Sequence, residues 1–427
     1  MLFSTINQQL PNRSLNGSRP RVLHVATSPL AAQWFMRGQL RYLREAGFDV
    51  TVITAPGPGL DKTRVVEGVN AIGVPMIREI ALWHDLVSLW RLRRVISRLR
   101  PVITNVGTPK AALLGGISAW LCRVPCRFYT MRGLRCETAR GFRRWLLLLA
   151  ERIACLCAHR VLCISESLRQ RAIALGIVDA DRSFVLGPGT CNGIDAGRFA
   201  PTDELLRRGD QLRGHLGIPR EAPVVGFVGR LTRDKGIPEL LDAYDRLRPE
   251  FPDVWLLLVG GYEDGDPLDP LLRKRIEIEP NILRSGFVER VEAYYQVMNV
   301  LVLPTYREGF GNVILEAHAA GKPVVATRAT GVVDAVVDTV TGILVPVGDA
   351  QGLANALSFV LKDKALAARM GNAGRERVLS EFRQELIWEA LLEEYRTILR
   401  NKGLPLPEGS SRGCVPVMGR AYGESSS

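Results

Sequence analysis

The sequence has no long apolar run, few cysteines and few aromatic residues. Of its 427 residues, 7% are aromatic and eight are Cys. The longest apolar stretch, residues 145–158, is interrupted by Glu151 and Arg152. It is also shorter than the roughly 20 residues that a membrane-spanning helix needs. The first twenty residues are polar and lack an apolar core, so we expect neither a secretory signal nor a transmembrane helix.

The cysteines do not form a recognisable metal site or disulfide framework. Seven of them lie between Cys122 and Cys191, but their spacings match no zinc-binding pattern and no set of His partners completes one. We interpret them as buried apolar thiols in a reducing cytoplasm. We therefore expect no metal and no cofactor from this cluster.

Charge is unevenly distributed along the chain. The formal net charge is +12, yet residues 1–200 hold 28 basic and 12 acidic residues, whereas the remainder holds 28 basic and 32 acidic residues. The first half should therefore face something anionic, such as nucleic acid, acidic lipid or a phosphorylated small molecule. Nucleic acid is disfavoured because aromatic residues are scarce and no recognisable nucleic-acid-binding module is present.

Short apolar runs alternate with helix-period segments in two successive series, which is typical of parallel sheets covered by helices. The sequence therefore predicts an α/β fold of two doubly wound, Rossmann-like domains facing across a cleft. We expect a flexible N-terminus over 1–20, a first domain over 21–200, a second over 201–380, a helix over 381–402 and a disordered tail over 403–427. The predicted strands are 22–26, 50–54, 102–106, 126–130, 161–164 and 184–186, then 224–228, 254–259, 282–285, 300–303, 324–326 and 342–345, and helices are predicted over 33–46 and 205–216.

The segment 304–317 is the most informative for chemistry. A predicted strand ends at Leu303, a turn with Gly309 and Gly311 follows, and a helix begins near Gly311. A helix N-terminus exposes unpaired N–H groups that suit a phosphate. Glu308 before this helix and Glu316 inside it could grip hydroxyls on two parts of one ligand.

A second cluster follows the first strand of the second series. Arg230 and Lys235 flank a turn that ends at Gly236, and two cations at this spacing suit a diphosphate. Gly260-Gly261 and Gly286-Phe287-Val288 follow two further predicted strands, so the same edge of the sheet would gather them.

Together these residues resemble the retaining GT-B glycosyltransferases of family 4. The pair Glu308…Glu316 is similar to their Glu-x7-Glu motif, and Arg230 with Lys235 is similar to their diphosphate-binding pair. The likeness extends from Arg21 to about Arg400, and it implies that the helix over 381–402 crosses back to the first domain.

The resemblance implies a role for each matching position. The second domain would bind a nucleotide-sugar, a UDP- or GDP-sugar, which is a substrate and not a cofactor. Its diphosphate would contact Arg230 and Lys235, which replace a divalent cation. The remaining implied contacts are the backbone of Gly311, Asn312 and Val313 with the diphosphate, Glu316 with the ribose, Glu308 with the transferred sugar, and the backbone at Phe287 and Val288 with the base.

The resemblance further implies an acceptor in the basic first domain. Relatives of this type build capsule, exopolysaccharide or lipopolysaccharide on lipid-diphosphate-linked sugars, so we expect such an acceptor and a cytoplasmic enzyme peripheral to the inner membrane face. The chain departs from the family by lacking a Gly-Gly pair after the first strand and by carrying Arg132 where many relatives have His. The candidate acceptor-binding residues are Arg37, Lys110, Arg132 and Arg135.

Two basic segments bear on membrane contact. For residues 91–100 we favour an amphipathic helix that packs on its own sheet. For residues 140–149, where Arg140, Arg143 and Arg144 precede Trp145 and four leucines, we favour proximity to an anionic membrane. His318, in the helix that carries Glu316, is interpreted as a packing residue.

Two other functions remain open at this stage. One is a nucleotide-sugar 2-epimerase on the same fold, and the other is a non-catalytic binding module that uses the basic face. The combination of Arg230, Lys235, Glu308 and Glu316 disfavours both of them.

Overall fold

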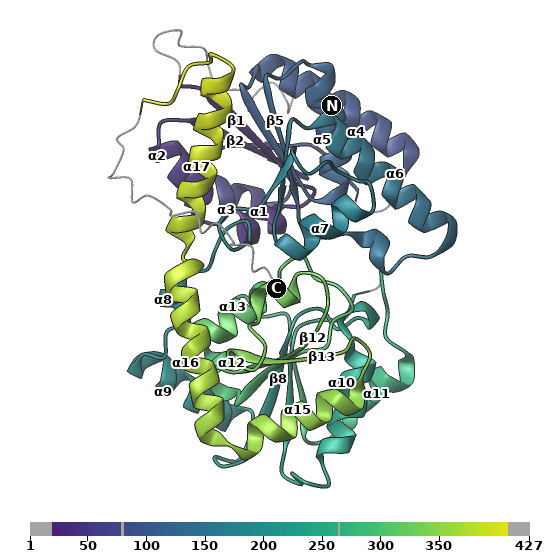
Figure 1. Ribbon diagram of the computed structural model, residues 1–427, viewed down its shortest axis with the longest axis vertical. Coiled ribbons are helices and arrows are strands. Elements are labelled where there is room, and N and C mark those ends of the chain that lie inside the picture. Colours follow the sequence, from purple (N-terminus) through teal and green to yellow (C-terminus); the bar gives the residue numbers. More distant parts are fainter. Residues whose placement is uncertain (1–18, 78–80, 264, 409–427) are drawn as a thin grey trace, which may run out of the picture.

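A computed structural model describes residues 19–77, 81–263 and 265–408. The described chain forms two α/β lobes, one above the other in Figure 1, each built on a single parallel sheet. The predicted fold class is therefore confirmed. The predicted flexible N-terminus and disordered tail lie almost wholly outside the described residues.

The first sheet has seven parallel strands in the order β3-β2-β1-β4-β5-β6-β7. The crossover helices lie on its two faces, because parallel strands can be joined only through such crossovers. The strands are β1 Arg21–Val25, β2 Asp49–Thr54, β3 Asn70–Gly73, β4 Ile103–Gly107, β5 Cys126–Met131, β6 Arg160–Cys163 and β7 Ser183–Phe184. The helices are α1 Pro29–Phe35, α2 Gln39–Glu45, α3 Pro58–Glu67, α4 Leu82–Leu99, α5 Pro109–Leu121, α6 Gly141–Cys157 and α7 Glu166–Ala174, with a 3-10 turn, η1, over Arg135–Glu137.

The second sheet has six parallel strands in the order β10-β9-β8-β11-β12-β13. All five residues of β8 and all four of β11 are buried, as their unbroken apolar sequences predict for central parallel strands. The strands are β8 Val224–Val228, β9 Trp255–Val259, β10 Ile282–Gly286, β11 Val300–Leu303, β12 Val324–Thr327 and β13 Gly342–Val345. The helices are α8 Ala196–Phe199, α9 Asp203–His215, η2 Arg233–Lys235, α10 Ile237–Leu247, α11 Pro270–Ile278, α12 Glu292–Val297, α13 Asn312–Ala319, α14 Val332–Ala335, α15 Ala350–Lys362, α16 Lys364–Glu381 and α17 Gln384–Asn401.

The last two helices divide between the lobes. Helix α16 packs against α13 in the second lobe, whereas α17 runs along the first lobe (Figure 1). Ile387, Leu391, Tyr395 and Leu399 of α17 are buried in the same cluster as residues of β1, β2, α1 and α2. The implied return of the C-terminal helix to the first domain is thus confirmed. The exact domain limits stay predictions.

One helix prediction is wrong, because the structure has two helices where the sequence predicts one. The sequence predicts a single helix over 33–46, but the structure has α1 and α2 with a break at Met36–Gly38. Gly38 adopts φ 78°, and a Cβ there would collide with the Trp388 ring of α17. The break therefore arises from packing against a helix 350 residues later, which local periodicity cannot reveal. Strand β3 is also present in the structure but is not among the strands predicted from the sequence.

Candidate active site

The loop that follows β11, residues 304–311, lies at the contact between the two lobes. The Ser165 hydroxyl, just after β6, donates a hydrogen bond to the carbonyl of Gly309 at 2.7 Å. A Cβ at residue 309 would collide with the carbonyl oxygen of Arg132, which follows β5. Glycine is therefore required for this close approach. The carboxyl ends of strands from both sheets thus meet at this loop, the position at which open α/β sheets bind ligands.

Lys235 and Glu308 form an ion pair at this position. Only 13% of the lysine side chain and 18% of the glutamate side chain is exposed. Gly236 has φ 70°, and a Cβ there would collide with the carbonyl oxygen of Pro304. The glycine thus lets the turn that carries Lys235 approach the loop that carries Glu308. Two residues that the sequence singles out separately are brought into contact.

Arg230 belongs to a network of charges beside this pair. It forms ion pairs with Glu263 and, at 3.8 Å, with Asp234. Asp234 is also paired with Arg307 at 2.8 Å. Burial alone would raise the pKa of Asp234, but the Thr232 hydroxyl and the two arginines lower it further than burial raises it. The acid therefore stays ionised and orients the cations around it.

Glu316 lies inside α13 and is partly buried. The Tyr295 hydroxyl donates a hydrogen bond to one carboxylate oxygen at 2.6 Å. Burial raises the pKa of Glu316 to about 7, although the Tyr295 hydrogen bond and Arg198 act in the opposite direction. The helix begins after Gly311, whose φ is 86°. Asn312 and Val313 form its first turn, so their amides lie at the helix end that suits an anion.

We expect Glu316→Gln to change the pH dependence of folding. A carboxyl whose pKa is raised in the folded state contributes stability below its unfolded pKa, and that contribution is lost as the pH rises through about 7. Between pH 5 and pH 8, the free energy of unfolding of the wild type should fall by about 2–3 kcal/mol relative to that of Glu316→Gln. Denaturant unfolding of both proteins at the two pH values measures this difference. If the difference in unfolding free energy between the two proteins is the same at both pH values, the raised pKa of Glu316 is contradicted.

Phe287 and Val288 directly follow β10. The ring of Phe287 is exposed and stacks on Trp34 of α1, with centroids 5.7 Å apart and an interplanar angle of 3°. Beside this stack, Lys62 of the first lobe pairs with Glu289 of the second. The side chain of Phe287 thus contacts the other lobe, and the predicted contact of its backbone with a base stays a prediction.

The four predicted acceptor residues lie on different segments of the first lobe. The side chain of Arg37 is exposed, and its carbonyl accepts a hydrogen bond from Asn192. Lys110 is paired with Asp85 at 2.8 Å. Arg135 lies in η1, and Arg132 lies against the loop at Gly309. Their predicted role in acceptor binding stays a prediction.

His318 and the cysteines are packing residues, as the sequence predicts. His318 is buried, burial lowers its pKa to about 4, and its Nε2 lies 3.1 Å from the carbonyl of Thr341. The seven described cysteines are free thiols, and all except Cys122 are buried.

Sequence reasoning missed several partners of the candidate residues, namely Glu263, Asp234, Arg307, Tyr295 and Trp34. The sequence could have identified Asp234 and Glu263, because each follows the carboxyl end of a strand of the second sheet. No sequence pattern indicated Tyr295 or Trp34, which lie on helices in other segments of the chain.

The acidic residues that the structure describes at the site do not form a metal centre. Asp-x-Asp spacing occurs twice in the sequence, at 179–181 and 264–266. Asp266 accepts a hydrogen bond from the backbone N–H of Asp234 at 2.8 Å. Within the described ranges, no group of three or more His, Cys, Asp or Glu residues could hold a metal ion.

Known proteins resemble this chain along most of its length. Residues 210–377 match the family Glycosyl transferases group 1, and residues 31–189 match the Glycosyl transferase 4-like domain. The capsular polysaccharide biosynthesis glycosyltransferase CapM of Staphylococcus aureus is 36% identical over 380 residues, 89% of this chain and 98% of CapM. The UDP-Gal:alpha-D-GlcNAc-diphosphoundecaprenol alpha-1,3-galactosyltransferase of Escherichia coli is 27% identical over 376 residues, 86% of this chain and 94% of that enzyme.

The fold has close counterparts among solved structures. Anabaena Alr3699/HepE in complex with UDP and glucose superposes with a TM-score of 0.73 at 20% identity, covering 88% of this chain and 99% of that chain. At this level of identity the likeness establishes the fold alone.

Proposed function

The chain belongs to the group 1 glycosyl transferase family, and from this we propose that it moves a hexose-type sugar from a UDP- or GDP-sugar to a lipid-diphosphate-linked or glycan acceptor with retention of configuration. We place this reaction in the assembly of a surface polysaccharide. The similarity to CapM and to the E. coli galactosyltransferase supports the pathway and the kind of acceptor.

The observation that carries the proposal is the Lys235–Glu308 pair at the contact between the two lobes. A largely buried pair of opposite charges provides one group for each half of a nucleotide-sugar. The ammonium suits the diphosphate and the carboxylate suits the sugar hydroxyls. Donor binding would separate the two side chains, and each would then contact its own part of the donor.

The other residues of the second lobe would complete the donor site. Arg230 would hold the diphosphate with Lys235, supported by the first-turn amides of α13 at Asn312 and Val313 and by the backbone of Gly311. Glu316 would accept hydrogen bonds from the ribose hydroxyls, and Phe287–Val288 would contact the base. Arg230 and Lys235 supply the positive charge that a divalent cation supplies elsewhere, so we propose metal-independent transfer.

The same residues would act on the transition state. As the bond from the anomeric carbon to the diphosphate breaks, negative charge grows on the leaving oxygen, and preorganised cations stabilise this charge more than the ground state. The leaving phosphate would accept the proton of the acceptor hydroxyl on the same face of the sugar. Because the loop at Gly309 touches the first lobe directly, the lobes would separate to admit substrates and close to exclude water.

Donor binding is tested by thermal unfolding in the presence of UDP-, GDP- and ADP-sugars. We expect one class of nucleotide to raise the unfolding temperature, since a ligand that binds only the folded state stabilises it. The same nucleotide should give little or no shift with Arg230→Ala. If none of the nucleotide-sugars shifts the transition of the wild type, the proposed donor site is wrong.

One outer face of the first lobe suits an anionic membrane. The helices α4, α5 and α6 pack side by side, and each exposes large apolar side chains. Leu92, Val95, Ile96 and Leu99 of α4 are buried, which confirms the predicted packing of residues 91–100 on the sheet. The exposed aromatic residues of this face are Trp83, Trp90, Trp120, Phe142 and Trp145.

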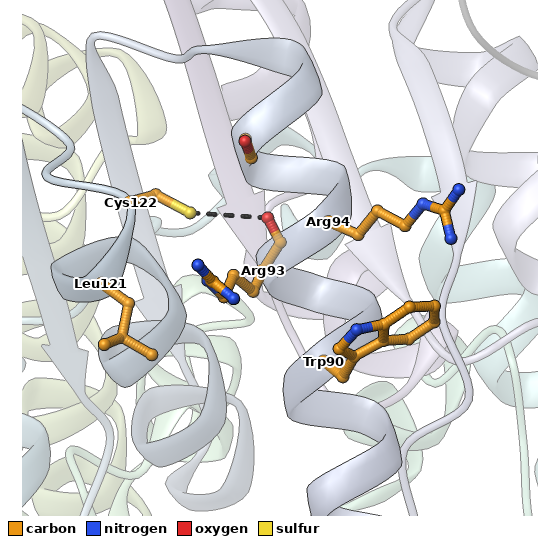
Figure 2. Close-up of a pocket in the computed structure, with 6 residues that line it drawn as sticks. Trp90, Arg93, Arg94, Leu121 and Cys122 are labelled. Carbon is orange, nitrogen blue, oxygen red and sulfur yellow. Dashed lines mark hydrogen bonds between the residues drawn. The ribbon is translucent and has the colours of Figure 1, made fainter.

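Arginines accompany these aromatic residues. A hollow of about 370 Å³ lies between α4 and α5. The side chains that line it include Trp90, Arg93, Arg94, Leu121 and Cys122 (Figure 2). The guanidinium of Arg94 lies 5.3 Å from the Trp90 ring centroid, and the Cys122 thiol donates to the carbonyl of Arg93 at 3.4 Å. No helix within the described ranges is long and apolar enough to cross a membrane. We propose peripheral contact with the inner face of the plasma membrane through this surface.

We expect Arg140→Gln/Arg143→Gln to weaken binding to anionic vesicles roughly 30-fold, because each arginine near such a surface contributes about 1 kcal/mol. Co-sedimentation with phosphatidylglycerol-containing vesicles measures this change, with pure phosphatidylcholine vesicles as the uncharged reference. Arg207→Gln/Arg220→Gln, with the same change of charge on the second lobe, should bind as the wild type does. Equal losses in both double variants would contradict a specific docking face.

A further inference from the structure

Arg132 carries a guanidinium group that the protein itself leaves unsatisfied. Its Nε and Nη1 atoms are buried, and neither has a hydrogen-bond partner among the described residues. The guanidinium lies 5.2 Å from the ring centroid of Phe35, a contact that leaves the N–H groups in its plane unused. Buried polar groups are nearly always paired, so an unpaired guanidinium calls for a partner from outside the chain.

The polar side chains near Arg132 do not pair with its Nε or Nη1 atom. Asn105 donates to the Tyr395 hydroxyl at 2.7 Å and accepts from the Thr130 hydroxyl at 2.8 Å, so its side chain is already engaged. His24 is buried, and burial together with the charge of Arg132 lowers its pKa to about 3. This imidazole is therefore neutral, and its buried Nε2 likewise has no hydrogen-bond partner among the described residues.

The backbone around Arg132 is arranged to receive its side chain. A Cβ at Gly107 would collide with Arg132 Nη1, so glycine at the end of β4 makes room for the guanidinium. The next residue, Thr108, has φ 74°, which is unfavourable for a β-branched residue. Thr108 precedes α5, a helix of thirteen residues whose N-terminus has no side-chain cap. The guanidinium therefore lies beside a helix N-terminus at the carboxyl edge of the first sheet.

We propose that Arg132 binds an oxyanion of a substrate, separate from the donor diphosphate, so that the enzyme handles an anionic sugar or a phosphorylated acceptor. This inference rests on the proposed function and deepens it. The planar fork of arginine pairs with a carboxylate or a phosphate. Two sources supply that chemistry: the carboxylate of a uronic acid in the donor, and a phosphate of the acceptor. The backbone carbonyl of Arg132 faces Gly309, so residue 132 lies beside the loop that carries Glu308, while its guanidinium lies at Gly107.

The test measures binding and does not require transfer. Wild type, Arg132→Gln and the exposed control Arg64→Gln are loaded with the nucleoside diphosphate that stabilises the wild type, taken below as UDP. Thermal unfolding is then followed with added glucuronate, inorganic phosphate or geranyl diphosphate, and with glucose as the neutral control. We expect at least one anion, but not glucose, to stabilise the wild type and Arg64→Gln, with about tenfold weaker binding to Arg132→Gln. Stabilisation by glucuronate identifies a uronic acid, and stabilisation by the phosphates alone identifies the acceptor.

Two further measurements distinguish a loss of anion binding from a loss of folding stability and from a loss of nucleotide binding. Without ligand, Arg132→Gln should be at least as stable as the wild type, because it removes a charged group with two buried, unpaired nitrogens. UDP should bind Arg132→Gln with unchanged affinity. The proposal is overturned if no anion stabilises the UDP-loaded wild type, if Arg132→Gln binds the anions normally, or if its affinity for UDP falls by the same factor. Normal UDP binding with no anion effect would leave the proposed transferase function intact.

Discussion

Lys235→Ala should lose turnover by a factor of about 10²–10³, the usual effect of removing one group that stabilises charge in a transition state. The leaving diphosphate gains negative charge as the sugar departs, and Lys235 is the largely buried cation beside Glu308. A mobile ammonium that follows this charge acts more on the transition state than on the bound donor. We therefore expect kcat to fall and the affinity for the nucleoside diphosphate to fall with it. Steady-state release of the nucleoside diphosphate measures the former, and calorimetry the latter.

The control must separate this loss from unfolding. Removing Lys235 leaves Glu308 without its partner, which lowers the stability of the folded protein by about 1–3 kcal/mol. The double variant Lys235→Ala/Glu308→Gln should regain part of that stability and none of the activity. Lys274→Ala, an exposed lysine of α11, should match the wild type in both. Near-normal turnover in folded Lys235→Ala would refute its role.

Glu308→Gln should lower kcat/KM for the nucleotide-sugar by about 10²-fold or more without lowering the affinity for the free nucleoside diphosphate. Its carboxylate would accept hydrogen bonds from the sugar hydroxyls, whereas the nucleoside diphosphate lacks the sugar. A neutral amide keeps the size of the side chain but loses the charge-assisted hydrogen bonds. The contrast with Lys235→Ala, which should affect both ligands, assigns the two residues to different parts of the donor.

The exposed Glu376→Gln on α16 is the matched control and should behave as the wild type. A loss of nucleoside diphosphate affinity in Glu308→Gln as large as its loss of kcat/KM would contradict the assignment to the sugar. Unchanged kinetics with both ligands would remove Glu308 from the site.

The sheets could be predicted from the sequence because their strands are buried on both faces. Unbroken apolar runs such as 224–228 and 300–303 match β8 and β11 residue by residue. The break between α1 and α2 could not be predicted, because it depends on Trp388 packing against Gly38. Strand β3 was also missed: it has four residues, and only Ile72 among them is buried.

The candidate site was predictable where one segment carries the information. Glu308, Gly311 and Glu316 lie on one loop and helix, so their spacing is visible in the sequence. The pairing of Lys235 with Glu308 joins residues 73 positions apart and depends on Gly236 fitting against Pro304. The raised pKa of Glu316 depends on burial, which spacing does not encode.

The basic residues that give residues 1–200 their excess positive charge lie in several different parts of the structure. Some of it is paired within the lobe, as Lys110 is with Asp85. Some lies with exposed tryptophans on α4 and α6, where a membrane would attract it. Arg132 has two buried guanidinium nitrogens without a partner among the described residues, and its backbone carbonyl faces the loop of the proposed donor site.

The most direct test of the account is product analysis. The enzyme is mixed with a panel of nucleotide-sugars and an undecaprenyl-diphosphate-linked sugar, and both the lipid and the nucleotide fractions are analysed by mass spectrometry. We predict that the lipid-linked sugar gains the mass of one sugar residue as one nucleoside diphosphate is released, and that Lys235→Ala produces neither. An isomerised nucleotide-sugar with no sugar on the lipid, or no turnover of any donor with any acceptor of this class, would contradict the account.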